Sequence, residues 1–178
     1  VTVHLYGFSY LQRHILDKRI DHYQKQDSSD FHIGILHGNE GSGTDHDNYA
    51  PFSIKDLLEK EFDYWALGHI HKRTILSETP PIIYPGNIQG RNKKETGVKG
   101  CYHITLNELE AKTEFIETSD VLWEEVTVDA ALAQSFQEIL QLCQLTIERL
   151  RKAGLGTLLT LNLKNVQLDD FQEKKILN

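Results

Sequence analysis

Short apolar runs separated by polar and turn-forming residues dominate the first 119 positions of the chain. Each run is bounded by Gly, Pro, Asp or Asn, which is typical of strands that end in turns. The last two runs are joined near Asn107 and predict an antiparallel hairpin. The predicted strands lie at residues 1–7, 31–36, 63–67, 82–84, 97–106 and 111–117.

Two segments of the same region show the 3.6-residue spacing of apolar positions that is typical of helices. Each follows a serine that has a Gln or Asp three positions later, the pattern of a capping box. Ser9 precedes a predicted helix over residues 10–25, and Ser53 precedes a shorter one over residues 54–61. Strands that alternate with helices in this way predict an α/β fold.

The pattern changes near residue 120, where a long amphipathic helix begins to replace short strands. Asp129 is its predicted N-cap and Gly154 its predicted end. We therefore predict two domains, a mixed α/β body at residues 1–119 and a small α/β appendage at residues 120–178. The predicted elements of the appendage are a strand at 121–128, a helix over 129–153, a strand at 157–163 and an amphipathic tail to residue 178.

The composition is that of an ordinary globular protein. Of the 178 residues, 39% are hydrophobic and 25% are charged. No apolar run approaches the roughly 18 residues of a membrane span, and no N-terminal segment indicates a signal peptide. Cys101 and Cys143 stand far apart in the sequence, so we expect reduced thiols and a cytoplasmic location.

The net charge of −7 argues against nucleic-acid binding by bulk charge. The local charge between residues 68 and 103 has the opposite sign. This local excess of positive charge indicates either a solvated loop surface or a basic rim that contacts phosphate groups. The basic residues are Lys72, Arg73, Arg91, Lys93, Lys94 and Lys99, against Glu78 and Glu95.

Three histidines follow directly on apolar strands. His69 and His71 belong to a Gly-His-Ile-His motif after one strand, and His37 ends another. In an extended segment the side chains of residues i and i+2 share one face, and adjacent parallel strands would bring His37 beside them. A lone pair of histidines is most often incidental surface chemistry, but three at two strand ends favour metal ligands.

The motifs His-Gly-Asn at 37–39 and Gly-His-Ile-His at 68–71 resemble the calcineurin-like metallophosphoesterase family. Tyr-Pro-Gly-Asn at 84–87, which we expect to shape the wall of the site, strengthens the likeness. Within the family the chain is most similar to DNA repair exonucleases of the SbcD type. The resemblance implies the C-terminal part of a four-layer β-sandwich phosphoesterase domain in residues 1–119, followed by the start of a capping domain.

The resemblance also implies a chemistry, in which two divalent metal ions, usually manganese, clamp a phosphodiester and activate water. His37 and His69 would bind one metal and His71 the other. DNA is the implied substrate, and the implied partners are an SbcC-like coiled-coil ATPase and a second copy of the chain. The candidate substrate contacts are Asn39, Lys72, Arg73 and Arg91.

The family also needs an Asp-x-His motif, a bridging Asp and an Asn-His pair before these motifs, and none stands at a matching position. Asp45-His46-Asp47 is the only carboxylate–histidine cluster, and it is out of family order. The chain also contains no Met and opens within a predicted strand. We therefore expect a fragment of a longer enzyme that is inactive alone, with no catalytic residue beyond the metal ligands.

Three alternatives stay open, and a fourth is disfavoured. The chain is a degenerate paralogue, its N-terminal half is a separate or removed chain, or it is a non-catalytic module whose 129–153 helix docks a partner ATPase or a second copy. A metallo-β-lactamase fold is disfavoured, because Lys72 and Arg73 stand where that fold needs an Asp-His pair.

Overall fold

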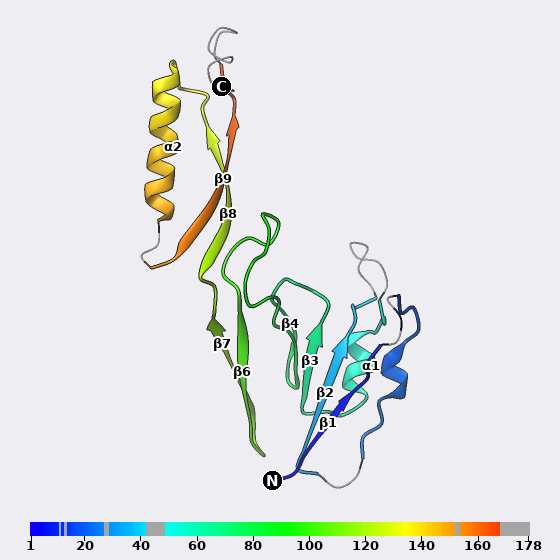
Figure 1. The fold of residues 1–178 in the computed structure, drawn as a ribbon. Coiled ribbons are helices and arrows are strands. Elements are labelled where there is room, and N and C mark those ends of the chain that lie inside the picture. Colours follow the sequence, from blue (N-terminus) through cyan, green and yellow to red (C-terminus); the bar gives the residue numbers. More distant parts are fainter. Residues whose placement is uncertain (11, 13, 27–28, 42–48, 152–153, 168–178) are drawn as a thin grey trace. The chain divides into compact units, whose positions relative to one another are not determined.

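The computed structural model describes residues 1–178 except 11, 13, 27–28, 42–48, 152–153 and 168–178 (Figure 1). The chain forms two compact units. Contacts group the segment Gln89–Val98 with the second unit, a grouping that the sequence pattern does not contain. Unit 1 comprises Val1–Ile88 and Lys99–Thr118, and unit 2 comprises Gln89–Val98 and Ser119–Asn178.

Unit 1 contains a five-stranded sheet in the order β1-β2-β3-β5-β4. The first four strands in this order are parallel, and β4 runs antiparallel to β5. His37 pairs with Gly68, so β2 and β3 end at the same edge of the sheet. The strands are β1 (Val3–Gly7), β2 (Phe31–His37), β3 (Tyr64–Gly68), β4 (Thr74–Glu78) and β5 (Pro81–Tyr84).

The strands predicted at 1–7, 31–36, 63–67 and 82–84 are confirmed as β1, β2, β3 and β5. Strand β4 was not predicted. Its residues are exposed or only partly buried, and its register with β5 shifts between Ile75 and Ser77. A bulged edge strand of this kind has no clean alternation of apolar and polar residues, so its sequence lacks the usual signal.

The predicted helix over 10–25 is wrong. The described residues of this range contain only a 3₁₀ helix, η1 (Arg19–His22). The carbonyl of Ile15 accepts a hydrogen bond from the Ala50 amide at 2.7 Å, a long-range contact in place of a helical one. Tertiary contacts thus override the local helical pattern.

Helix α1 (Ile54–Leu58) confirms the second helix prediction, although it ends before residue 61. Ser53 Oγ accepts from the Asp56 amide at 3.2 Å, and Asp56 Oδ2 accepts from the Ser53 amide at 2.7 Å. The predicted capping box is therefore present. The C-cap is Glu59, and Glu61, two residues later, takes a positive φ of 55°.

The core of unit 1 packs around Trp65, which is fully buried on β3. Its Nε1 donates to the Leu57 carbonyl at 3.2 Å, and its ring stacks on Phe62 with centroids 4.9 Å apart. A Cβ atom at Gly34 on the neighbouring strand would overlap this ring. The glycine therefore makes room for the tryptophan.

The predicted hairpin is also confirmed. Strands β6 (Gly100–Leu106) and β7 (Ala111–Glu117) pair antiparallel. Asn107 Oδ1 accepts from the amides of Leu109 and Glu110 at 2.8 and 2.9 Å, which closes the turn.

Unit 2 is a β-α-β arrangement in which β8 (Val121–Asp129) and β9 (Gly156–Lys164) are parallel and α2 (Phe136–Leu150) connects them (Figure 1). The predicted helix bounds of 129 and 153 are wrong. Ser135 is the N-cap, because its Oγ accepts from the Glu138 amide, and Arg151 is the C-cap. Asp129 instead accepts from the Ala131 amide at 3.0 Å. The predicted tail beyond residue 167 lies outside the described residues.

The segment Gln89–Val98 packs against the start of β8. Gln89 Nε2 donates to the Val121 carbonyl at 2.6 Å, and Trp123 Nε1 donates to the Gly90 carbonyl at 3.1 Å. These side-chain bonds explain why the segment joins unit 2.

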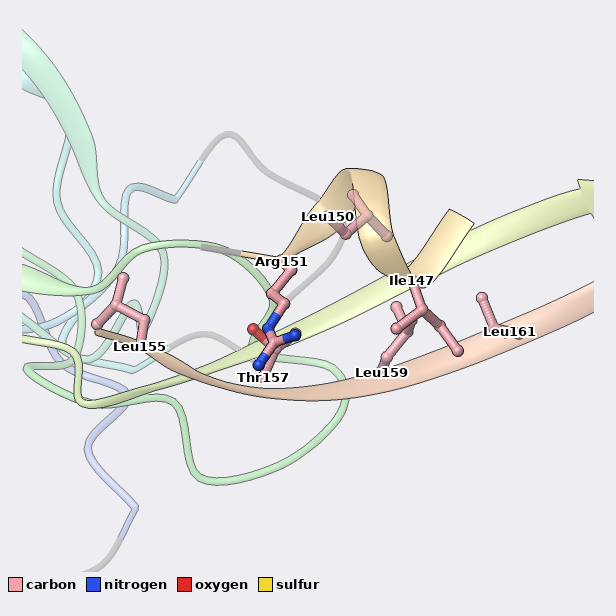
Figure 2. A pocket seen from close by; sticks show the side chains of 7 residues that line it. All are labelled: Ile147, Leu150, Arg151, Leu155, Thr157, Leu159 and Leu161. Carbon is pink, nitrogen blue, oxygen red and sulfur yellow. The ribbon is translucent and has the colours of Figure 1, made fainter. Parts of the chain in front are cut away.

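An apolar groove of about 400 Å³ lies between the end of α2 and β9 (Figure 2). Arg151 is the one charged side chain among its lining residues. They are Ile147, Leu150, Arg151, Leu155, Thr157, Leu159 and Leu161.

The mixed α/β class predicted from the sequence is confirmed. Both cysteines are free. In the part of the chain that the structure describes, no helix is both long enough and apolar enough to cross a membrane.

Candidate metal centre

His37 stands at the carboxyl end of β2, beside the last residue of β3. A Cβ atom added to Gly68 would lie 2.9 Å from His37 Nδ1 and 3.6 Å from its Cγ. The imidazole therefore lies over the end of the neighbouring strand, and only a glycine at position 68 leaves it this space.

The structure brings His69 next to His37. Their ring centroids are 5.3 Å apart and the ring planes are nearly perpendicular, at 83°. The prediction that parallel strands place these two histidines together is confirmed. The reason is the register of the sheet, which aligns the ends of β2 and β3.

The backbone at His69 differs from the extended segment that the sequence suggested. Strand β3 ends at Gly68, and His69 has a φ of 99°. A shared face for residues i and i+2 therefore does not apply to His69 and His71. A positive φ in a residue with a Cβ costs about 1–3 kcal/mol and persists only where the surroundings hold it.

Burial lowers the pKa of His37 below its ordinary value, and the nearby His71 lowers it further. The third predicted histidine is thus close enough to act on the first. A lowered pKa keeps the imidazole neutral near pH 7, and the neutral imidazole is the form that binds metals.

Two tyrosines surround these rings, and sequence reasoning missed both. Tyr49 stacks on His69, with centroids 5.1 Å apart and planes at 11°, and meets His37 edge-on at 5.5 Å. Tyr10 meets Tyr49 edge-on at 5.7 Å and donates from its hydroxyl to the His37 carbonyl at 2.8 Å. Neither belongs to a recognisable motif, so no sequence signal could have found them.

Asn39, a predicted substrate contact, lies in the wall behind His37. It is buried, and its Oδ1 accepts from the Tyr49 amide at 2.7 Å. This bond joins Asn39, which follows the His37-Gly38 pair, to Tyr49. Its substrate role stays a prediction.

The turn after β5 contacts both histidine segments. A Cβ atom at Gly86, whose φ is 77°, would lie 2.7 Å from the His71 carbonyl oxygen. The Asn87 amide donates to that same oxygen at 3.3 Å, and the Tyr84 hydroxyl donates to the Gly38 carbonyl at 2.6 Å. The last residue of β5 and the turn after it therefore hold the segments after β2 and β3, as a wall of the site would.

The three basic candidates fall into different units. Lys72 and Arg73 follow His71 in unit 1, where the Arg73 guanidinium lies 4.0 Å from the centroid of the Phe115 ring. Arg91 belongs to unit 2, and its amide donates to Glu95 Oε2 at 2.8 Å. Their contact with a substrate stays a prediction.

The three histidines are suitable metal ligands by residue type, but they do not complete a metal site. Among the described residues, no group of three or more His, Cys, Asp or Glu side chains is arranged to hold a metal ion. The Asp45–Asp47 cluster lies outside these residues. Imidazoles that meet where two parallel strands end suit borderline divalent metals, so the histidines fit the nitrogen half of a metal centre.

No protein-family model matches the chain. A curated protein from Bacillus subtilis (strain 168), named as the uncharacterized metallophosphoesterase YhaO, is 44% identical over 151 residues. The similar region covers 84% of this chain but 37% of that protein, so the chain spans well under half of this relative. This similarity supports membership of the chain in the metallophosphoesterase superfamily.

Proposed function

We propose that this chain is part of a metallophosphoesterase, in which His37, His69 and His71 supply the nitrogen ligands of a divalent metal centre. One observation carries the proposal: the His37 and His69 rings meet at 5.3 Å where two parallel strands end. Binding sites of α/β sheets gather at the carboxyl ends of strands. The similarity to a protein named a metallophosphoesterase supports the same assignment.

The proposal needs further ligands from outside the described residues. Among the residues that the structure describes, the three histidines do not form a metal-binding group by themselves, and no carboxylate completes one. We therefore expect the 178-residue chain to bind a divalent metal weakly and to hydrolyse nothing by itself.

Divalent metal ions in such a centre supply Lewis acidity toward a phosphoryl oxygen and toward water. The residues of this chain have narrower tasks. His37 offers a neutral imidazole because burial lowers its pKa. Gly68 leaves the space for that ring, and Tyr84 holds the backbone after it through the Gly38 carbonyl.

The proposed substrate is a phosphodiester in DNA, cleaved by an exonuclease with manganese. The resemblance to SbcD-type nucleases supports it, as do Lys72 and Arg73 beside His71, since basic residues position phosphate groups. The net charge of −7 adds no support.

The test uses the full-length protein that contains these residues. It should hydrolyse bis(p-nitrophenyl) phosphate and linear double-stranded DNA with Mn²⁺ and lose both activities with a chelator. His69→Ala or His71→Ala should lower kcat/KM by about 100-fold or more, because charge stabilisation worth several kcal/mol is lost.

His103→Ala is the matched control, because His103 is an exposed histidine on β6. It should leave kcat/KM unchanged. Undiminished activity in both His69→Ala and His71→Ala would overturn the proposal. Hydrolysis of the small ester without DNA cleavage would keep the phosphoesterase and reject the nuclease.

The second candidate is a non-catalytic module that docks a coiled-coil ATPase through α2. The apolar groove beside β9 favours it, because a coiled-coil helix carries an apolar stripe that such a groove accepts (Figure 2). Leu159→Ser should weaken binding to that ATPase in a sedimentation assay, while Leu109→Ser, at an exposed turn of unit 1, should not. Equal binding by both variants contradicts the docking role.

A further inference from the structure

The rings around the proposed metal centre form a connected frame. Tyr49 is its middle member, since its ring stacks on His69 at 5.1 Å and meets His37 and Tyr10 edge-on at 5.5 and 5.7 Å. A stacked neighbour limits rotation of the imidazole about its side-chain torsions. Edge-to-face and stacked ring pairs attract each other beyond the effect of the area they bury.

The backbone of Tyr49 is held on both sides. Its carbonyl accepts from the Asn39 amide at 2.9 Å, and its amide donates to Asn39 Oδ1 at 2.7 Å. Asn39 is buried, and the Ala50 amide that follows bonds the Ile15 carbonyl at 2.7 Å. The tyrosine ring is therefore presented from a fixed backbone, as a positioning group must be.

His69 needs such support. Its φ of 99° is strained for a residue with a Cβ atom, and it stands one residue beyond the last strand residue. The Tyr49 ring lies nearly parallel to its imidazole, with planes at 11° and centroids 5.1 Å apart. Because metal binding requires a nitrogen lone pair in a set direction, an imidazole packed against a parallel ring should bind a cation more tightly.

We infer that Tyr49 is a positioning residue of the centre: its ring fixes the orientation of the His69 imidazole and so raises the affinity for a divalent cation. This inference rests on the proposed function for its metal, but the ring orientation is a property of the metal-free chain. Tyr49 acts through His69 and is not itself assigned to the metal.

The test compares Tyr49→Leu with Tyr49→Phe in the 178-residue chain. In metal-free protein, NMR signals of the His69 ring should move downfield in Tyr49→Leu, because the shielding of a stacked ring is lost. Zn²⁺ titration, followed by the histidine ring signals, should give an affinity about tenfold lower in Tyr49→Leu. Tyr49→Phe keeps the stacked ring and should restore both readouts.

Tyr102→Leu is the control for a general loss of packing, because Tyr102 meets Phe115 at 5.3 Å on the β6–β7 hairpin. It should lower the melting temperature without moving the His69 signals. Unchanged His69 signals and Zn²⁺ affinity in Tyr49→Leu would overturn the inference, as would a Tyr49→Phe variant as weak as Tyr49→Leu.

The failures of the two proposals are distinguishable. If Zn²⁺ moves no histidine signal of the wild-type chain even at millimolar concentration, the metal centre is rejected. The metal-free His69 signals in the two Tyr49 variants then still decide whether Tyr49 positions the ring.

Discussion

Two pairs of histidines lie at opposite ends of the parallel strands of unit 1, with nearly the same ring geometry. His37 and His69, at the carboxyl ends of β2 and β3, have centroids 5.3 Å apart and planes at 83°. His4 and His32, near the starts of β1 and β2, have centroids 5.8 Å apart and planes at 84°. Distance and angle alone therefore do not separate a metal centre from a packed pair.

The contacts that each histidine makes distinguish the two pairs. His32 is buried, with the Tyr6 hydroxyl 2.8 Å from Nδ1 and the Ser29 hydroxyl 3.3 Å from Nε2. Both nitrogens thus have protein partners. His37 instead contacts aromatic rings and lies over a glycine. A histidine with hydroxyl partners at both nitrogens is a satisfied core residue, whereas one framed by rings keeps a lone pair for a ligand.

The largest expected effect is a difference in metal affinity between variants of the two histidine pairs. In the full-length protein, His69→Ala should lower the Mn²⁺ affinity by about 100-fold, the upper range for perturbing a metal centre, whereas His32→Ala should leave it unchanged. Isothermal titration calorimetry measures both. Equal losses of Mn²⁺ affinity in the two variants would show that the two histidine pairs do not differ in function.

A smaller effect is expected at Gly68. Gly68→Ala places a methyl group 2.9 Å from His37 Nδ1 and forces the ring to move, so the metal affinity should fall about tenfold. Gly7→Ala, whose Cβ would meet only ordinary contacts of 3.5 Å or more, is the matched control. Titration of the two variants should separate them, and similar affinities would contradict the close approach.

The next prediction concerns the pair at the N-terminal ends of the strands. Tyr6→Phe removes the hydroxyl that lies beside His32 Nδ1 and should destabilise the fold by about 1–2 kcal/mol, with no change in metal affinity. Urea unfolding followed by tryptophan fluorescence measures the first effect. A loss of metal affinity instead would mean that the two histidine pairs are coupled.

The smallest effect lies at the capping box of α1. Burial raises the pKa of Asp56, but hydrogen bonds from Lys18 and Ser53 outweigh it and hold the pKa below its ordinary value. A lowered carboxyl pKa contributes stability above the unfolded pKa, and that stability is lost as pH falls through the folded pKa. Thermal melts at decreasing pH should therefore converge for wild type and Asp56→Asn.

A companion variant sharpens this result. Ser53→Ala removes the acceptor of the Asp56 amide and should cost about 1 kcal/mol at neutral pH. The difference in melting temperature between Asp56→Asn and wild type should vanish in acid. If it persists, the Lys18–Asp56 contact at 2.9 Å is not what lowers the pKa of Asp56.

Sequence alone determined the elements whose signal is local. The apolar runs of β2, β3 and β5 sit between turn residues, and Ser53 with Asp56 forms the predicted capping box, because strand burial and capping depend on residues a few positions apart. The strand-end placement of the three candidate histidines follows from the same apolar runs, so local patterning was enough to predict it.

Only the tertiary structure decided the rest. The helical spacing over 10–25 lost to the bond between Ile15 and Ala50, and the end of β3 gave His69 a positive φ that no pattern encodes. Tyr49 reaches the histidines from a loop without a motif. In each case the deciding contact joins residues far apart in sequence, and local periodicity carries no information about which distant partner will be there.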